Sequence, residues 1–147
     1  MKTIKLREVR YSPGYGDMLG GNHEMTLNLN GEGRMTCRDR ETWDAPTVIA
    51  VYEVLPEAIA ELEDFIVQKK VFSLEDRPKS DLFVTDYHPW GFWFEYETTS
   101  FGKTERNVCI LTEYQNYSKK DYEVIDGVRE RLSALRGRKI SETAQEK

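Results

Sequence analysis

Cysteine and histidine are scarce in this chain, whose 147 residues include two of each. Cys37 and Cys109 cannot form a disulfide framework, and neither belongs to a Cys-x-x-Cys pair that would indicate zinc or redox chemistry. The cysteine usage therefore fits a reducing cytoplasm best. With so few thiol and imidazole donors, we assign neither a metal ion nor another cofactor to the chain.

Long hydrophobic runs are also lacking. The longest apolar stretch, Thr47 to Tyr52, is far shorter than the roughly 20 residues that span a bilayer. The first eight residues alternate charged and apolar side chains without the apolar run of a secretory signal, so we expect neither export nor membrane insertion. The chain has 21 basic and 26 acidic residues and a net charge of -5. Its length suits one domain, whose core needs no disulfide or metal to be stable.

Alternating apolar residues predict strands in the first half of the chain. Residues 4–11 indicate a strand with a bulge near Arg7 and Glu8, where the apolar parity changes. Residues 24–30 and 34–38 indicate a hairpin, and residues 47–52 a short buried strand. For the hairpin we predict a three-residue loop, Gly31–Gly33, with Gly33 in the left-handed conformation. That register sets Leu29 opposite Met35, Leu27 opposite Cys37 and Glu24 opposite Arg40.

Helical spacing and a second hairpin follow. Apolar residues from Leu55 to Ile66 predict a helix from about Pro56 to Lys70, with its acidic residues on the other face. Residues 90–97 alternate aromatic with other side chains and predict a strand, which a loop at 100–102 connects to a mostly buried strand at 108–111. Ser118 and Asp121 indicate the start of a last helix that ends near Gly137.

These elements predict an α+β fold, with an antiparallel sheet of about five to six strands built from two hairpins and two helices packed on one face. We expect a single domain over residues 1–140, followed by a polar C-terminal tail at 141–147.

Signatures of catalysis are missing. There is no Gly-x-Ser-x-Gly elbow, and the glycines at 14–21 lack the spacing of a dinucleotide fingerprint. Asp86 and His88, two apart on an extended segment, have the spacing of metal ligands and would have to recruit His23 from elsewhere in the chain. A small-molecule or metal-dependent enzyme using His23, Asp86 and His88 is therefore the alternative function.

Two features indicate a binding surface. Alternation sends Trp93 to the face of the sheet opposite its aromatic neighbours, where an exposed Trp is typical of interfaces. The Gly-rich loop at 12–22 is long enough to suggest a role in binding, with Tyr15 and Met18 as its apolar contacts. Alternatively, this loop covers Trp93 and is structural.

Charge is distributed unevenly. Residues 53–97 hold eleven acidic and four basic residues, net -7, including Glu57 and Glu61 on the polar face of the first helix. Arg38 and Arg40 share a strand face and could form a local basic footprint or pair with carboxylates across the strands. Because the acidic middle of the chain repels phosphates, direct nucleic-acid binding is not expected.

The sequence therefore predicts a small acidic cytoplasmic protein. We expect it to bind another macromolecule and not to be an enzyme. We expect a protein partner, as for an inhibitor, immunity or regulatory protein, held by the open sheet face and the Gly-rich loop. A homodimer through the aromatic face is the other arrangement that the pattern allows.

Overall fold

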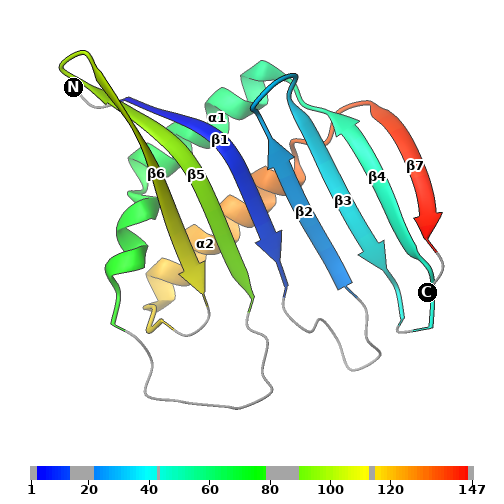
Figure 1. The fold of residues 1–147 in the computed structure, drawn as a ribbon. Helices are drawn as coiled ribbons and strands as arrows, with labels where there is room; N and C mark the ends of the chain where they lie inside the picture. Colours follow the sequence, from blue (N-terminus) through cyan, green and yellow to red (C-terminus); the bar gives the residue numbers. More distant parts are fainter. Residues whose placement is uncertain (1–2, 14–21, 43, 79–89, 113–114, 146–147) are drawn as a thin grey trace.

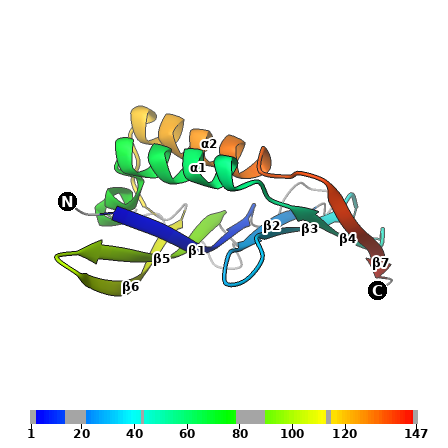
Figure 2. The same cartoon turned by 90° about the horizontal axis from the view of Figure 1, so that it is seen from above.

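A single antiparallel sheet organises the molecule. The structure is a computed structural model that describes residues 3–13, 22–42, 44–78, 90–112 and 115–145. Within these ranges seven strands form one sheet in the order β6-β5-β1-β2-β3-β4-β7 (Figure 1). Both α-helices lie on the same face of the sheet and leave the other face open (Figure 2). The elements are β1 (Thr3–Ser12), β2 (Asn22–Asn28), β3 (Arg34–Arg40), β4 (Thr47–Glu53), α1 (Pro56–Gln68), the 3-10 helix η1 (Val71–Asp76), β5 (Gly91–Ser100), β6 (Lys103–Thr112), α2 (Lys119–Ser133) and β7 (Lys139–Gln145).

The expected α+β class and antiparallel sheet are confirmed, but the number of strands and the construction from two hairpins are wrong. Three further strands complete the sheet: β1 lies between the hairpins β2-β3 and β5-β6, and β4 and β7 follow β3 at the other side. Residues 141–145, which we expected in a polar tail, belong to β7 and pair with β4. An edge strand that packs against no helix needs few apolar residues, and the apolar Ile140 of β7 is 45% exposed. No helix in the described part of the chain is long and apolar enough to cross a membrane.

The bulge expected in β1 is confirmed. The register of β1 against β5 shifts between Leu6 and Glu8, and this shift lets both Leu6 and Val9 face the helices, where they are fully buried. Strand β2 pairs with β1 only from Glu8 onward. Before Glu8, the backbone N–H of Leu6 donates instead to Glu63 Oε2 of α1 at 2.8 Å. The helix thus replaces a strand partner there.

The registers of the two hairpins differ from the prediction. In the first hairpin Leu27 lies opposite Met35 and Met25 opposite Cys37, which leaves five residues, 29–33, in the loop. Gly33 has no positive φ, because Gly102 alone has one among the glycines that the structure describes. In the second hairpin Ser100 pairs with Lys103 across a two-residue turn, not three.

Local signals position both helices as expected. Pro56 begins α1, whose Leu62 and Ile66 are buried. Ser118 caps α2 through a capping box, in which its side chain accepts from the Asp121 N–H while the Asp121 carboxylate accepts from the Ser118 N–H. The two helices therefore start where the sequence indicates.

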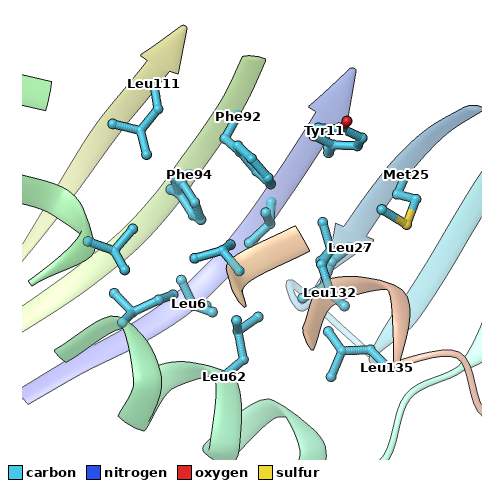
Figure 3. Packing of buried hydrophobic residues seen from close by; sticks show 14 of the residues in the cluster. Leu6, Tyr11, Met25, Leu27, Leu62, Phe92, Phe94, Leu111, Leu132 and Leu135 are labelled. Atoms are coloured by element: carbon cyan, nitrogen blue, oxygen red, sulfur yellow. The ribbon is translucent and has the colours of Figure 1, made fainter. Parts of the chain in front are cut away.

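The core lies between the helices and the covered face of the sheet. Figure 3 shows side chains from β1, β5 and β6 meeting those of the helices. Phe92 and Phe94 stack with ring centroids 5.7 Å apart, and Tyr11 approaches Phe92 at 4.7 Å. Because these residues define the covered face, the residues between them on each strand point to the open face.

Candidate functional site

One cross-strand row of nearly uncharged residues runs across the open face of the sheet. Each member lies directly opposite the next in the pairing of neighbouring strands, from β6 at one edge to β7 at the other. At about 4.8 Å between strands, this row is about 29 Å long. Arg10 is its one charged member. The residues of the row are Ile110, Trp93, Arg10, Thr26, Thr36, Val51 and Ser141.

Trp93 and Arg10 form a fixed pair in this row. The Arg10 guanidinium carbon lies 4.6 Å from the centre of the Trp93 ring, in a cation–π contact. Glu8 holds the same guanidinium through a 2.9 Å ion pair. Trp and Arg are among the residues that most often contribute binding energy in protein interfaces.

Apolar side chains of β6 extend this surface. Ile110 lies opposite Trp93, and Val108 lies opposite Glu95. Their exposed fractions are 46% and 47%. The sequence predicted a mostly buried strand here, but only Cys109 and Leu111 face the core. A run of four apolar residues conceals this alternation, because both of its faces are apolar.

A hollow of about 340 Å³ opens beside Trp93. Gly91, two residues before Trp93 on β5, lies in this hollow and has no side chain to fill it. Ile110 and Thr26 belong to the wall, and Glu24 contributes a carboxylate. Trp93 itself is half-buried rather than exposed. A hollow beside a half-buried Trp and an exposed Ile110 can receive an apolar side chain from another molecule.

No family model, no curated protein and no solved structure matches this chain. The geometry of the described residues therefore carries the functional argument alone.

Charged residues flank the row on both sides. Ion pairs join Arg106 to Glu95 at 2.8 Å and Arg7 to Glu97 at 3.0 Å. On the β2-β3 side Glu24 lies opposite Arg38, so the predicted pairing of Glu24 with Arg40 is wrong by one step along the face.

Arg38 and Arg40 share one face of β3, as expected, two residues apart. Arg38 is exposed and lies opposite Ile49, whereas Arg40 is half-buried at the strand end opposite Asn22. Both keep the parity of the open face, at increasing distance from the Trp93 row. Arg38 is therefore the nearer of the two to the candidate surface.

The other predicted binding residues lie elsewhere. Glu57 and Glu61 are exposed on α1, in the helix layer, and do not share a surface with Trp93 (Figure 2). Tyr15 and Met18 lie outside the described residues. Of the binding residues that the sequence indicated, Trp93, Arg38 and Arg40 lie on the open face.

His23 pairs with Asp39. Its Nδ1 lies 2.9 Å from Asp39 Oδ1, across the β2-β3 pair. Asp86 and His88 lie outside the described residues. Within the ranges that are described, no group of three or more His, Cys, Asp or Glu side chains could hold a metal ion.

Neither cysteine is prepared for nucleophilic chemistry. Burial, together with the nearby Glu75 and Asp76 carboxylates, raises the pKa of the Cys109 thiol to about 12. Burial also raises the pKa of Cys37. Both side chains are about 1% exposed and remain protonated thiols of the core at neutral pH.

Proposed function

We propose that this chain is a protein-binding module that holds its partner against the open face of the sheet. The observation that carries the proposal is the pairing of Trp93 with Arg10 beside a hollow and two exposed aliphatic side chains, Ile110 and Val108. Interfaces concentrate Trp and Arg at their centres, next to pockets that receive an anchor from the partner.

The partner presents an apolar side chain to the hollow beside Gly91 and a flat, weakly polar surface to the Thr26 and Thr36 part of the row. Charges of both signs on either side of the row orient the partner and add little affinity, because most are already paired within this chain. This is the mode of an inhibitor or regulatory protein.

The same face argues against nucleic acid as the partner. Carboxylates of Glu8, Glu95 and Glu97 pair with the arginines of this face, and Glu24 adds a further carboxylate at the hollow, so little free positive charge is left for a phosphate backbone. The buried thiols of Cys37 and Cys109 suit the reducing cytoplasm in which we propose that the module works.

Trp93→Ala tests the proposal, with Val67→Ala as its matched control. Val67 is 52% exposed on α1, so its replacement also removes exposed apolar surface, but on the helix side. A partner is first captured on the tagged wild-type chain from a lysate of the source cell, identified and purified. Its affinity for each variant is then measured by calorimetry.

We expect Trp93→Ala to weaken binding of the purified partner by about 30-fold or more, equivalent to about 2 kcal/mol, and Val67→Ala to leave it unchanged. Equal effects of the two variants, or capture of no stoichiometric protein, would contradict the proposal. A dimer of the wild-type chain in light scattering that Trp93→Ala dissociates would instead assign this face to self-association.

A further inference from the structure

A second hollow lies on the helix side of the sheet, at the end where β1 and β3 finish and β2 begins. Its volume is about 560 Å³, within the range of small-molecule sites. It is independent of the open face, because its walls come from α2 and from residues of the covered parity. Its lining includes Tyr11, Met25 and Cys37 on the floor, with charged residues of α2 and β3 on the walls.

The floor of this hollow is apolar. Tyr11, Met25 and Cys37 are buried and lie next to one another through the β1-β2 and β2-β3 pairing. The guanidinium of Arg129 lies 5.3 Å from the centre of the Tyr11 ring and limits the floor on the helix side. A surface of this kind accommodates the hydrocarbon part of a ligand.

One wall is basic. Arg129, Ser133 and Arg136 stand four and three residues apart, so that they occupy one side of α2 and its C-terminal end. Arg136 donates to the backbone carbonyl and the hydroxyl of Ser133, at 3.2 and 2.7 Å, and forms no ion pair with a described residue. Arg129 is paired with Asp126 at 2.8 Å, and its buried Nε has no hydrogen-bond partner among the described residues.

The opposite wall is acidic. Asp39 and Glu41 come from the end of β3 and the residue after it, and Asp39 also holds His23. Glu41 is exposed and forms no ion pair with any residue that the structure describes. The positive charge of Arg136 and the negative charge of Asp39 both act on the buried thiol of Cys37, with opposite effects on its pKa. Both walls line the same hollow as this apolar floor.

We infer that this hollow binds a small zwitterion that carries a hydrocarbon side chain. Its ammonium group lies toward Asp39 and Glu41, its acidic group accepts hydrogen bonds from Arg136 and Arg129, and its hydrocarbon part covers Tyr11, Met25 and Cys37. A ligand of one sign meets a like charge on one of the walls, whereas a zwitterion satisfies both.

Three probes with the same ring separate these classes. They are L-phenylalanine, which carries both charges, 3-phenylpropionate, which carries the acid alone, and phenethylamine, which carries the amine alone. The chain has two histidines, so in a His88→Asn variant the ring protons of His23 are the only histidine signals and report binding at this hollow by NMR.

We expect L-phenylalanine to shift the His23 signals in a saturable way and to bind at least about tenfold more tightly than either single-charged probe, a difference of about 1.4 kcal/mol. Arg136→Gln and Glu41→Gln each lower its affinity by a similar factor. Arg38→Gln, on the open face, is the control and leaves it unchanged.

Three outcomes overturn the inference. One is the absence of any saturable shift with all three probes. Another is equal or tighter binding of 3-phenylpropionate or phenethylamine, which would assign a site for ions of one sign. The last is an equal loss of affinity in Arg38→Gln, which would place the binding elsewhere. Arg38, Glu41 and Arg136 are exposed at the surface, so their variants are expected to fold.

Discussion

At the residue scale, Asp121 connects three parts of the fold. Its carboxylate accepts from Arg77 Nε and Nη2 at 2.9 and 3.1 Å, and it closes the capping box with Ser118. These hydrogen bonds from Arg77, followed by those from Ser118, hold the pKa of Asp121 at about 2, below its ordinary value of 3.8. The chain segment after η1 is thereby fixed to the start of α2.

Asp121→Asn should therefore destabilise the protein in a pH-dependent way. A carboxyl whose pKa is lowered on folding contributes stability above its unfolded pKa and loses it as the pH falls through the folded value. We expect a cost of about 1–2 kcal/mol at pH 7, allowing for the partial exposure of Arg77, that shrinks between about pH 4 and pH 2. Urea unfolding across this range measures it. Asp126→Asn, on the exposed side of α2, should cost less than about 0.5 kcal/mol at any pH.

Phe101 is the most exposed of the large hydrophobic residues described, at 97%, and it occupies a strained position. Its φ of 53° and the φ of 78° at Gly102 form the two-residue turn between β5 and β6, where Asn and Gly are the preferred pair. We expect Phe101→Asn to stabilise the fold by about 0.5–1 kcal/mol in thermal or urea unfolding. A loss of stability would show that Phe101 supports the hairpin.

At the element scale, α1 and α2 approach closely at Gly127. A Cβ added there would lie 2.6 Å from Phe65 Cζ, and Arg131 already lies over the other part of that ring, 3.9 Å from its centre. From the sequence, Gly127 only weakens a helix, by about 1 kcal/mol relative to Ala. In the structure it makes room for the neighbouring helix.

Gly127→Ala should consequently have opposite effects in two backgrounds. In the wild-type chain we expect a loss of about 1 kcal/mol or more, because Phe65 must move. In a Phe65→Ala background the same change should stabilise by up to about 1 kcal/mol, because only the helix propensity remains. A double-mutant cycle in urea gives both values. Stabilisation in the wild-type chain would contradict the close approach.

The elements differ in how far the sequence predicts them. Periodicity and capping were sufficient for α1 and α2, since Pro56 and Ser118 act locally. Polar β7 lacks any such signal, because its stability comes from backbone pairing with β4 rather than from its side chains. The register of the first hairpin was wrong by two residues, since Gly33 resembles a turn glycine but has no positive φ, and a Cβ added to it would lie 3.3 Å from Leu29 Cδ2.

The candidate surface was predicted in part for the same reason. The facing of Trp93 follows from alternation along one strand, which is local. Its neighbour Ile110 lies on the other strand of the same hairpin, whereas Arg10 comes from β1, far away in the chain, and sequence alone does not give the pairing of β1 with β5. The hollow beside Gly91 likewise depends on the whole sheet.

At the scale of the whole molecule, the two edges of the sheet are finished differently. Side chains cap the outer edge of β6, where Glu75 accepts from the Ile110 N–H and Gln115 accepts from the Thr112 N–H. Gln115 is itself held by the carbonyls of Leu74 and Glu75. The other edge is β7, which shields the apolar residues of β4 from pairing with other chains.

Ending the chain after Arg138 removes this shield. We expect the shortened chain to unfold about 5–10 °C below the full chain and to form soluble oligomers, because β4 with Ile49 and Val51 becomes an open edge. Calorimetry and light scattering measure both effects. The matched control replaces Glu142 by Gln, which keeps β7 and changes only a surface ion pair with Lys139. A monomeric shortened chain of unchanged melting temperature would show that β7 protects nothing.

The position of β1 between β2 and β5 also governs how the chain can fold. Tyr11 pairs with Met25 on one side and with Phe92 on the other, so one neighbour is close in sequence and the other is distant. During synthesis at 5–20 residues per second, β1 waits about 4–16 s for the distant strand. Throughout that interval β1, which later lies inside the sheet, has one edge without a strand partner. The late synthesis of β5 therefore limits the rate of folding.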